Sequence, residues 1–213
     1  MKNFTKLDQP TGRSIYLDGK ESLFFGGTSY LGLATDNEYT ELFIEGQAIF
    51  DKAEEYAAQR FGFEYGLLLS SGYLATQFVV KTLSQEGKLL YAPASHPSLW
   101  LDANPGVVGD FRDWSFHTVD YINKSKETSF VIVSNSLDNM KPERYDFSVF
   151  DEISDAKRVT LLLDDSHGIG VLHENGISLL ERGFLRENME LIVVASLAKG
   201  LATDAGLILA SQK

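Results

Sequence analysis

Lys199 stands alone among apolar and small residues in the segment LIVVASLAKGLATDAGLILAS, residues 191–211. Burying an unpaired ammonium group costs several kcal/mol or lowers the pKa of the amine until it loses its proton. A neutral amine held in such a place is suited to react as a nucleophile with a carbonyl group. The alternative is a loop position from which the lysine side chain reaches water.

Two carboxylates and a histidine follow three leucines in LLLDDSHGIG, residues 161–170. Asp164, Asp165 and His167 would suit a metal ion, but no further carboxylate cluster completes a coordination shell, so we expect no metal. A hydrolase would need a nucleophile on a G-x-S-x-G turn, which the chain lacks. The structural alternative is an aspartate that caps the following turn.

Three further segments carry polar residues next to expected strands. SSGY (70–73) runs into a helix, where free backbone N–H groups and a glycine make a site for an anion such as phosphate. His96 precedes a short helical stretch, and Asn135, Ser136 and Asn139 follow another apolar run. All of these residue types also occur in ordinary turns.

Alternating strand and helix patterns place these residues along the chain. The apolar runs are continuous, which is typical of strands covered on both faces. Their alternation with helical segments predicts a three-layer α/β fold, with a mostly parallel sheet and helices on both faces. We expect strands at 66–70, 88–92, 106–111, 130–135, 159–165, 191–196 and 206–211, helices at 72–85, 96–103, 115–125 and 147–157, a helical pattern from 36 to 60, and an N-terminal hairpin formed by 14–19 and 22–27.

Size and composition indicate a globular protein. The 213 residues, 44% of them hydrophobic and 23% charged, allow one large or two small domains. The strand–helix pattern favours one large domain over 36–213, preceded by an N-terminal segment over 1–35 that contains the hairpin. A net charge of −11 argues against a nucleic-acid partner. The chain has no cysteine, no signal-peptide pattern and no 18-residue apolar run, so we expect a cytoplasmic protein without a membrane span.

In the predicted sheet the reactive residues gather beyond the carboxyl ends of the strands, where α/β proteins bind ligands. A lysine amine, a carboxylate and an anion site are together what pyridoxal 5′-phosphate requires, because the cofactor has an aldehyde, a pyridinium nitrogen and a phosphate. The sequence therefore predicts a pyridoxal-phosphate site.

The chain resembles the α-oxoamine synthases, fold-type I pyridoxal-phosphate enzymes that include 8-amino-7-oxononanoate synthase. The most specific of the motifs that carry the resemblance is DDSHGIGVLHENG. The motifs follow the family's order along nearly the whole chain: YLGLA (30–34), SSGYLATQ (70–77), SHPSL (95–99), DDSHGIGVLHENG (164–176) and SLAKGL (196–201).

The resemblance implies a role for each of four catalytic residues. Lys199 looks like the lysine that carries the cofactor covalently, and Asp164 like the partner of the pyridinium nitrogen. His167 looks like the donor to the phenolic oxygen of the ring. His96 looks like the residue that stacks on the face of the pyridine ring.

The resemblance also implies a phosphate cradle. Gly72 and Tyr73 look like the turn that binds the cofactor phosphate, with help from the Ser196 hydroxyl. Asn139 stands where a hydroxyl would help to hold the phenolic oxygen, and it completes the predicted cofactor-binding residues.

The implied reaction is the decarboxylative condensation of an amino acid with an acyl-CoA to give an α-oxoamine, catalysed by a homodimer. Three departures leave two alternatives open, a fold-type I aminotransferase or lyase and a non-catalytic partner subunit. The family's glycine-rich loop has no counterpart, which suggests residues missing between Phe50 and Asp51, and SNSLDNMKPE (134–143) is altered. The smaller C-terminal domain, with its arginine for the substrate carboxylate, is also expected to be absent from this chain.

Overall fold

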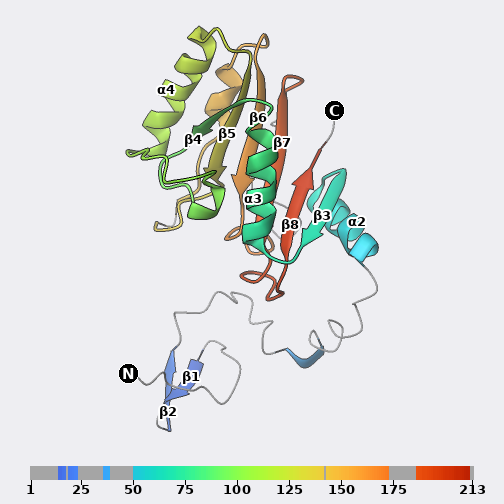
Figure 1. Ribbon diagram of the computed structural model, residues 1–213. Coiled ribbons are helices and arrows are strands. Elements are labelled where there is room, and N and C mark those ends of the chain that lie inside the picture. The colour runs from blue at the N-terminus through green and yellow to red at the C-terminus, as the bar shows by residue number, and fades with distance from the viewer. Residues whose placement is uncertain are drawn as a thin grey trace.

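A computed structural model describes residues 14–17, 19–23, 36–38, 50–141, 143–172 and 186–211. Its centre is a six-stranded mixed sheet with the strand order β3-β8-β7-β6-β5-β4 (Figure 1). Four neighbouring strands are parallel, and β8 runs antiparallel to β7 and β3. The strands are β3 (Tyr65–Leu69), β4 (Lys88–Tyr91), β5 (Ser129–Asn135), β6 (Arg158–Asp164), β7 (Met189–Ser196) and β8 (Gly206–Ala210).

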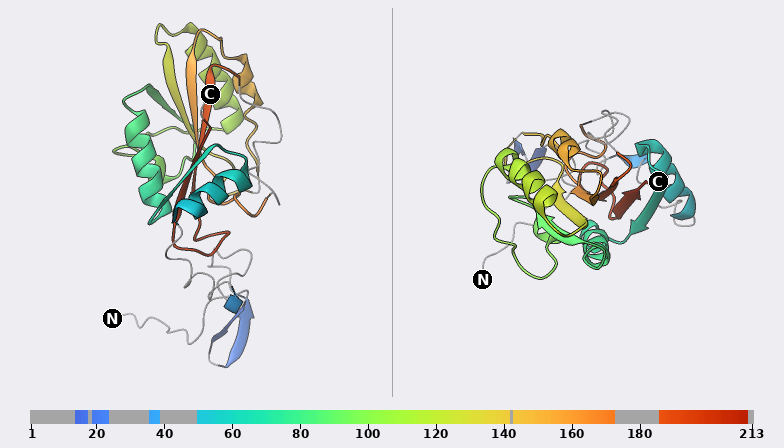
Figure 2. Two further views of the ribbon diagram at one scale, coloured as in Figure 1. Left: turned by 90° about the vertical axis from the view of Figure 1, so that its right-hand side faces the viewer. Right: turned by 90° about the horizontal axis from the view of Figure 1, so that it is seen from above.

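Helices cover both faces of this sheet, as two views at right angles show (Figure 2). Helix α3 (Gly72–Leu83) packs on one face, where its apolar side chains join one hydrophobic cluster. Helix α2 (Phe50–Phe61), helix α4 (Phe111–Lys124) and the 3-10 helix η4 (Ser148–Glu152) contribute to a second cluster on the other face. The predicted three-layer α/β fold with a mostly parallel sheet is confirmed.

Strand β6 shows why its sequence is a continuous apolar run. Leu161 and Leu163 belong to the cluster beneath α4, whereas Leu162 belongs to the cluster beneath α3. All three are at most 1% exposed. Burial of each leucine contributes about 1.5–3 kcal/mol, so β6 anchors both layers of the core and fixes the position of the polar residues that follow it.

Helix α2 closes the edge of the sheet at β3. The backbone N–H of Leu68 donates to Glu54 Oε1 at 2.7 Å. A Cβ atom on Gly66 would lie 2.6 Å from the Glu54 carbonyl oxygen, so only glycine allows the helix to approach this closely. The edge strand is thus partly protected from pairing with another chain.

Three of the predicted elements are missing or much shorter in the structure, and α4 begins at Phe111, four residues earlier than expected. No strand forms at 106–111, because Gly106 and Gly109 have φ angles of +69° and +118° and the Val108 side chain is exposed. The helix expected at 96–103 shrinks to the 3-10 helix η3 (Pro97–Leu99). The helix expected at 147–157 is the short η4, which ends at Glu152.

At the N-terminus, β1 (Ser14–Leu17) and β2 (Lys20–Leu23) pair as an antiparallel hairpin, whose second strand begins two residues earlier than expected. The YLGLA motif, residues 24–27 of the expected hairpin and most of the helical pattern before α2 lie outside the described residues. Helix α2 begins at Phe50, so Phe50 and Asp51 both lie in its first turn. The domain boundary near 35 and the missing segment after Phe50 stay predictions. Among the described residues, no helix has the length and apolar character needed to cross a bilayer.

Candidate active site

The carboxyl ends of the parallel strands bring several predicted site residues to one edge of the sheet. Asn135, the last residue of β5, is the register partner of Asp164, the last residue of β6. Ser196 ends the neighbouring strand β7. Since β5, β6 and β7 are parallel, these three positions lie at the same edge of the sheet, with Ser196 two residues beyond Val194, the register partner of Asp164.

Lys199 lies in the turn that joins β7 to β8, and its Nζ atom is 3.0 Å from Nε2 of His167. A hydrogen bond from Leu197 N to the Ala205 carbonyl oxygen closes this turn at 2.9 Å. A Cβ on Gly200 would lie 2.8 Å from the Ile169 carbonyl oxygen, so the turn packs directly on the segment that carries His167.

Burial controls the protonation of both side chains. It lowers the pKa of the Lys199 amine below its usual range, and the negative charge of Asp164 acts in the opposite direction. Burial also lowers the pKa of His167, as do the charges of Lys199 and His96, while Asp164 raises it. His167 is therefore mainly neutral at pH 7, and the Lys199 amine gives up its proton more readily than a lysine in water.

Ser166 holds the carboxylate of Asp164 in one orientation. Asp164 Oδ1 accepts hydrogen bonds from Ser166 N at 2.9 Å and from Ser166 Oγ at 2.5 Å. The same hydroxyl oxygen accepts from Ser196 N at 2.8 Å and so ties the end of β6 to the end of β7. Both of these hydrogen bonds to the Asp164 carboxylate go to Oδ1.

Asp165 points into the protein instead. Its side chain is 0% exposed, and Oδ1 accepts a hydrogen bond from the Ser136 hydroxyl. Within the described residues, Asp165 Oδ2 has no hydrogen-bond partner. Burial raises the pKa of this carboxyl to about 7, Ser136 opposes the shift, and the neighbouring charge of Asp164 adds to it. A Cβ on Gly168 would lie 2.3 Å from Asp165 Oδ1, so a larger residue at position 168 would displace the Asp165 carboxyl group.

The ring of His96 has a defined tautomer. The backbone N–H of Ser98 donates to His96 Nδ1 at 3.2 Å, and the Ser98 hydroxyl lies 2.7 Å from the same atom. Because a backbone N–H can only donate, Nδ1 is the acceptor and the neutral ring carries its proton on Nε2. A positive charge on the His96 ring would lower the pKa of His167, so the two rings lie within electrostatic range.

Helix α3 begins against β7. Ser71 caps the helix by accepting from Leu74 N at 3.2 Å, and a Cβ on Gly72 would lie 2.5 Å from Ser196 Cβ. The absence of a side chain at Gly72 thus lets the first turn of α3, with its free N–H groups, approach the backbone and Cβ of Ser196.

Two predicted cofactor-binding residues are not drawn into this network. Tyr73 is 65% exposed in the first turn of α3, and Asn139 is exposed in the loop that follows β5. In the part of the chain that the structure describes, neither side chain hydrogen-bonds to the four predicted catalytic residues. Their roles stay predictions.

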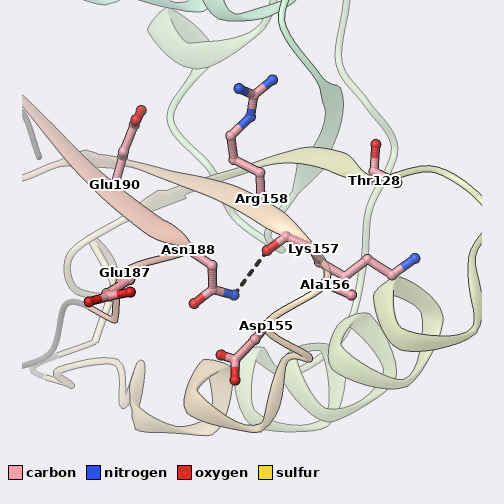
Figure 3. Close-up of a pocket in the computed structure, with 8 residues that line it drawn as sticks. All are labelled: Thr128, Asp155, Ala156, Lys157, Arg158, Glu187, Asn188 and Glu190. Atoms are coloured by element: carbon pink, nitrogen blue, oxygen red, sulfur yellow. Dashed lines mark hydrogen bonds between the residues drawn. The ribbon is translucent and has the colours of Figure 1, made fainter.

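A cavity of about 360 Å³ lies elsewhere (Figure 3). It is lined by residues at the amino ends of β6 and β7, including Arg158, Asn188 and Glu190. Asn188 Nδ2 donates to the Lys157 carbonyl oxygen at 2.9 Å within it. The cavity is therefore at the opposite end of these strands from Asp164 and Ser196, and it is not the predicted site.

Sequence reasoning did not single out Ser166 and noted Asn135 only as a hydrogen-bonding or turn-forming residue. The one local signal that could have indicated Ser166 is its hydroxyl group, two positions after the predicted catalytic aspartate. No local signal pointed to the contacts of Asn135, because its partners lie about forty positions away in the sequence.

Comparisons of sequence and structure show which known proteins the chain is similar to. The sequence model of the family described as Aminotransferase class I and II matches residues 42–213. An 8-amino-7-oxononanoate synthase of Aliivibrio fischeri (strain MJ11) is 24% identical over 229 residues, which cover 97% of this chain and 59% of the relative. The aligned length exceeds the 213 residues of this chain, so the relative has residues without a counterpart here.

Solved structures show the same fold. A structure described as SPT with PLP has a TM-score of 0.77 at 18% identity and is covered over 58% of its length by 97% of this chain. A Sphingomonas wittichii serine palmitoyltransferase has a TM-score of 0.75 at 17% identity, with 97% of this chain covering 57% of it. The chain thus spans less than two thirds of the length of the proteins it matches.

Proposed function

Because the chain belongs to the aminotransferase class I and II family, we propose that it is a pyridoxal-phosphate-dependent acyltransferase of the α-oxoamine synthase type. Family membership confirms the cofactor predicted from the sequence, and the matched relatives confirm the resemblance to the α-oxoamine synthases. The proposed reaction joins an amino acid to an acyl-CoA with loss of carbon dioxide. The observation that carries the proposal is the half-buried Lys199 amine beside His167 and within electrostatic range of Asp164.

The residues present fit pyridoxal phosphate. Gly72 leaves a cradle that a single Cβ would fill, at the start of a helix whose free N–H groups suit a phosphate. The carboxylate of Asp164, fixed through Ser166, suits a protonated ring nitrogen. When bound, the cofactor supplies an aldehyde that attaches to amino groups and a ring that withdraws electrons from the substrate's α-carbon.

We propose that Lys199 attaches the cofactor and afterwards serves as the base. Burial favours the neutral amine, which is the form that reacts with an aldehyde. An amine released in the same place can then accept a proton from the substrate's α-carbon. Lys199 lies in the connection over residues 197–205, which the hydrogen bond from Leu197 N to the Ala205 carbonyl oxygen closes.

His167 and His96 act on the ring in the proposed site. Neutral His167 offers a ring N–H to the phenolic oxygen of the cofactor without adding a second positive charge beside Lys199. His96, with its tautomer fixed by Ser98, presents a rigid flat surface for stacking. Each histidine comes from the segment that follows a parallel strand, so both approach from the same edge of the sheet.

Two measurements test the proposal in sequence. Borohydride reduction of the protein with added pyridoxal phosphate, followed by peptide mass spectrometry, should place the cofactor on Lys199. Incubation with amino acids and acyl-CoA should then release CoA thiol. Formation of a keto acid without thiol would favour the aminotransferase alternative, and failure to bind the cofactor would contradict the proposal.

We also propose that the chain acts as a homodimer on an amino acid and an acyl-CoA. The resemblance carries this part of the proposal, because family members form their sites at the subunit interface. Light scattering at micromolar concentration should give twice the 23.7 kDa mass of one chain. A monomer with full cofactor binding would overturn this part of the proposal alone.

A further inference from the structure

Both the oxygen and the nitrogen of the Asn135 side-chain amide form hydrogen bonds to one loop. Asn135 Oδ1 accepts a hydrogen bond from the backbone N–H of His96 at 3.0 Å, and Nδ2 donates to the Ala94 carbonyl oxygen at 2.9 Å. Asn135 is 1% exposed, so neither bond competes with water. The amide therefore binds the two backbone groups that flank Ser95, immediately before the predicted stacking histidine.

This loop has a backbone conformation that needs support. Ala94 has a φ angle of +55°, in the left-handed region that residues other than glycine rarely adopt. The bond from Asn135 Nδ2 to its carbonyl oxygen holds that conformation. On the other side, Trp100 Nε1 donates to the Ser95 carbonyl oxygen at 3.1 Å. The loop is thus fixed by side chains rather than by regular secondary structure.

Asn135 also connects this loop to the predicted partner of the ring nitrogen. It is the register partner of Asp164 across β5 and β6. The ring of His96 is held in turn by Ser98. A continuous set of bonds therefore runs from the end of β5, next to Asp164, to the imidazole of His96.

We propose that Asn135 is a positioning residue that fixes His96 relative to Asp164. It holds the surface on which the cofactor ring stacks at a set distance from the carboxylate that meets the ring nitrogen. The proposal rests on the proposed function for its benefit to cofactor binding. The other part of the proposal, that Asn135 holds the loop before His96, rests on the structure alone.

A double-mutant cycle on cofactor affinity tests whether Asn135 acts through His96. The dissociation constant of pyridoxal phosphate is measured for the wild-type protein, Asn135→Ala, His96→Ala and the double variant. Asn123→Ala is the matched control, because Asn123 binds Glu152 O and Ser154 N in the same bidentate way, remote from the site. Backbone amide exchange of His96 and Ser154 is followed in the protein without cofactor.

We expect each single variant at the site to weaken cofactor binding by up to about tenfold, and the double variant to match His96→Ala within about twofold. Asn123→Ala should leave the affinity unchanged. Exchange at the His96 amide should quicken at least about tenfold in Asn135→Ala, and only the Ser154 amide should quicken in the control. Additive losses of affinity, or an unchanged His96 amide, would overturn the proposal.

The two proposals fail in different ways. If the wild-type protein does not bind pyridoxal phosphate, the proposed function fails, and the His96 amide alone decides whether Asn135 holds the loop. If Asn135→Ala does not fold, Asn135→Asp takes its place in the cycle. It keeps an acceptor for the His96 N–H and loses the donor to Ala94, so a loss of affinity that depends on His96 supports the proposal and an additive loss overturns it.

Discussion

The Nζ atom of Lys199 lies 3.0 Å from Nε2 of His167, and the two residues come from segments thirty-two positions apart. Burial and the Lys199 charge both lower the pKa of His167. Replacing Lys199 with alanine removes the charge and admits water, so the pKa of His167 should rise. Titration of the imidazole by NMR, in the protein without cofactor, measures this change. An unchanged pKa would show that the two groups are independent.

Lys199 should be indispensable for turnover. Lys199→Ala should fold, bind pyridoxal phosphate without a covalent bond and lose several orders of magnitude in turnover, because nucleophile and base are lost together. Lys199→Arg should fail almost as severely, since a guanidinium keeps the charge but does not react with an aldehyde. Lys81→Ala, at an exposed position of α3, is the control. Near-native turnover in either variant would reduce Lys199 to an ordinary loop lysine.

His96→Ala should weaken cofactor binding more than it weakens the fold. A stacking contact with the ring is worth about 0.5–1.5 kcal/mol, or up to about tenfold in affinity. His117→Ala, on the exposed face of α4, should change neither property. Fluorescence titration with pyridoxal phosphate and thermal unfolding separate the two effects. A loss of thermal stability at constant affinity would make His96 a structural residue.

Gly72→Ala should separate crowding at the site from ordinary backbone strain. The new Cβ would lie 2.5 Å from Ser196 Cβ, so α3 must shift at a cost of about 1–3 kcal/mol and the phosphate cradle with it. Gly109→Ala, at φ +118° in open space, should cost about 1–2 kcal/mol from strain alone. Both variants lose stability in urea unfolding, but only Gly72→Ala should lose cofactor affinity. Equal affinities would remove Gly72 from the site.

Asp165 should make the stability of the protein depend on pH. Its folded pKa of about 7 lies above the unfolded value of 3.8, so the folded state holds the proton more tightly. The benefit is complete below pH 4 and is lost as the pH rises to about 7, by up to about 4 kcal/mol. Asp165→Asn stays neutral and should be more stable than the wild type at pH 8, with a difference that shrinks towards pH 4. Urea unfolding at both values measures it, and parallel pH profiles would contradict the assignment.

The sequence was sufficient for the parts of the fold that depend on local pattern. The continuous apolar runs of β5, β6 and β7 predicted buried parallel strands, and the helix that follows Ser71 was found within two residues of its end. The run GVVGDF led to a wrong strand prediction, because valine favours strands whereas both glycines of the run adopt positive φ angles. Which conformation a glycine adopts depends on surroundings that the local sequence does not contain.

In the candidate site, too, some residues could be predicted from local pattern and others could not. Lys199, Asp164 and His167 were recognisable because each follows an apolar run and belongs to a motif. Ser166 and Asn135 act on neighbours brought together by folding, and a hydroxyl or an amide has no distinctive pattern in sequence. The orientation of β8 was likewise undetermined, since an apolar run of five residues fits a parallel or an antiparallel strand equally well.

The position of β8 has a consequence for the order in which the chain is synthesised. β3 is the first strand of the large sheet to be made, yet its partner β8 is the last. Gly206 at the start of β8 sits so close to Ser71 that a Cβ would lie 2.1 Å from the Ser71 carbonyl oxygen. While residues 206–210 are still inside the ribosome, β3 and the start of α3 therefore lack their contacts with β8. The start of α3, where we propose that the phosphate binds, therefore gains its contact with Gly206 only after β8 has been made.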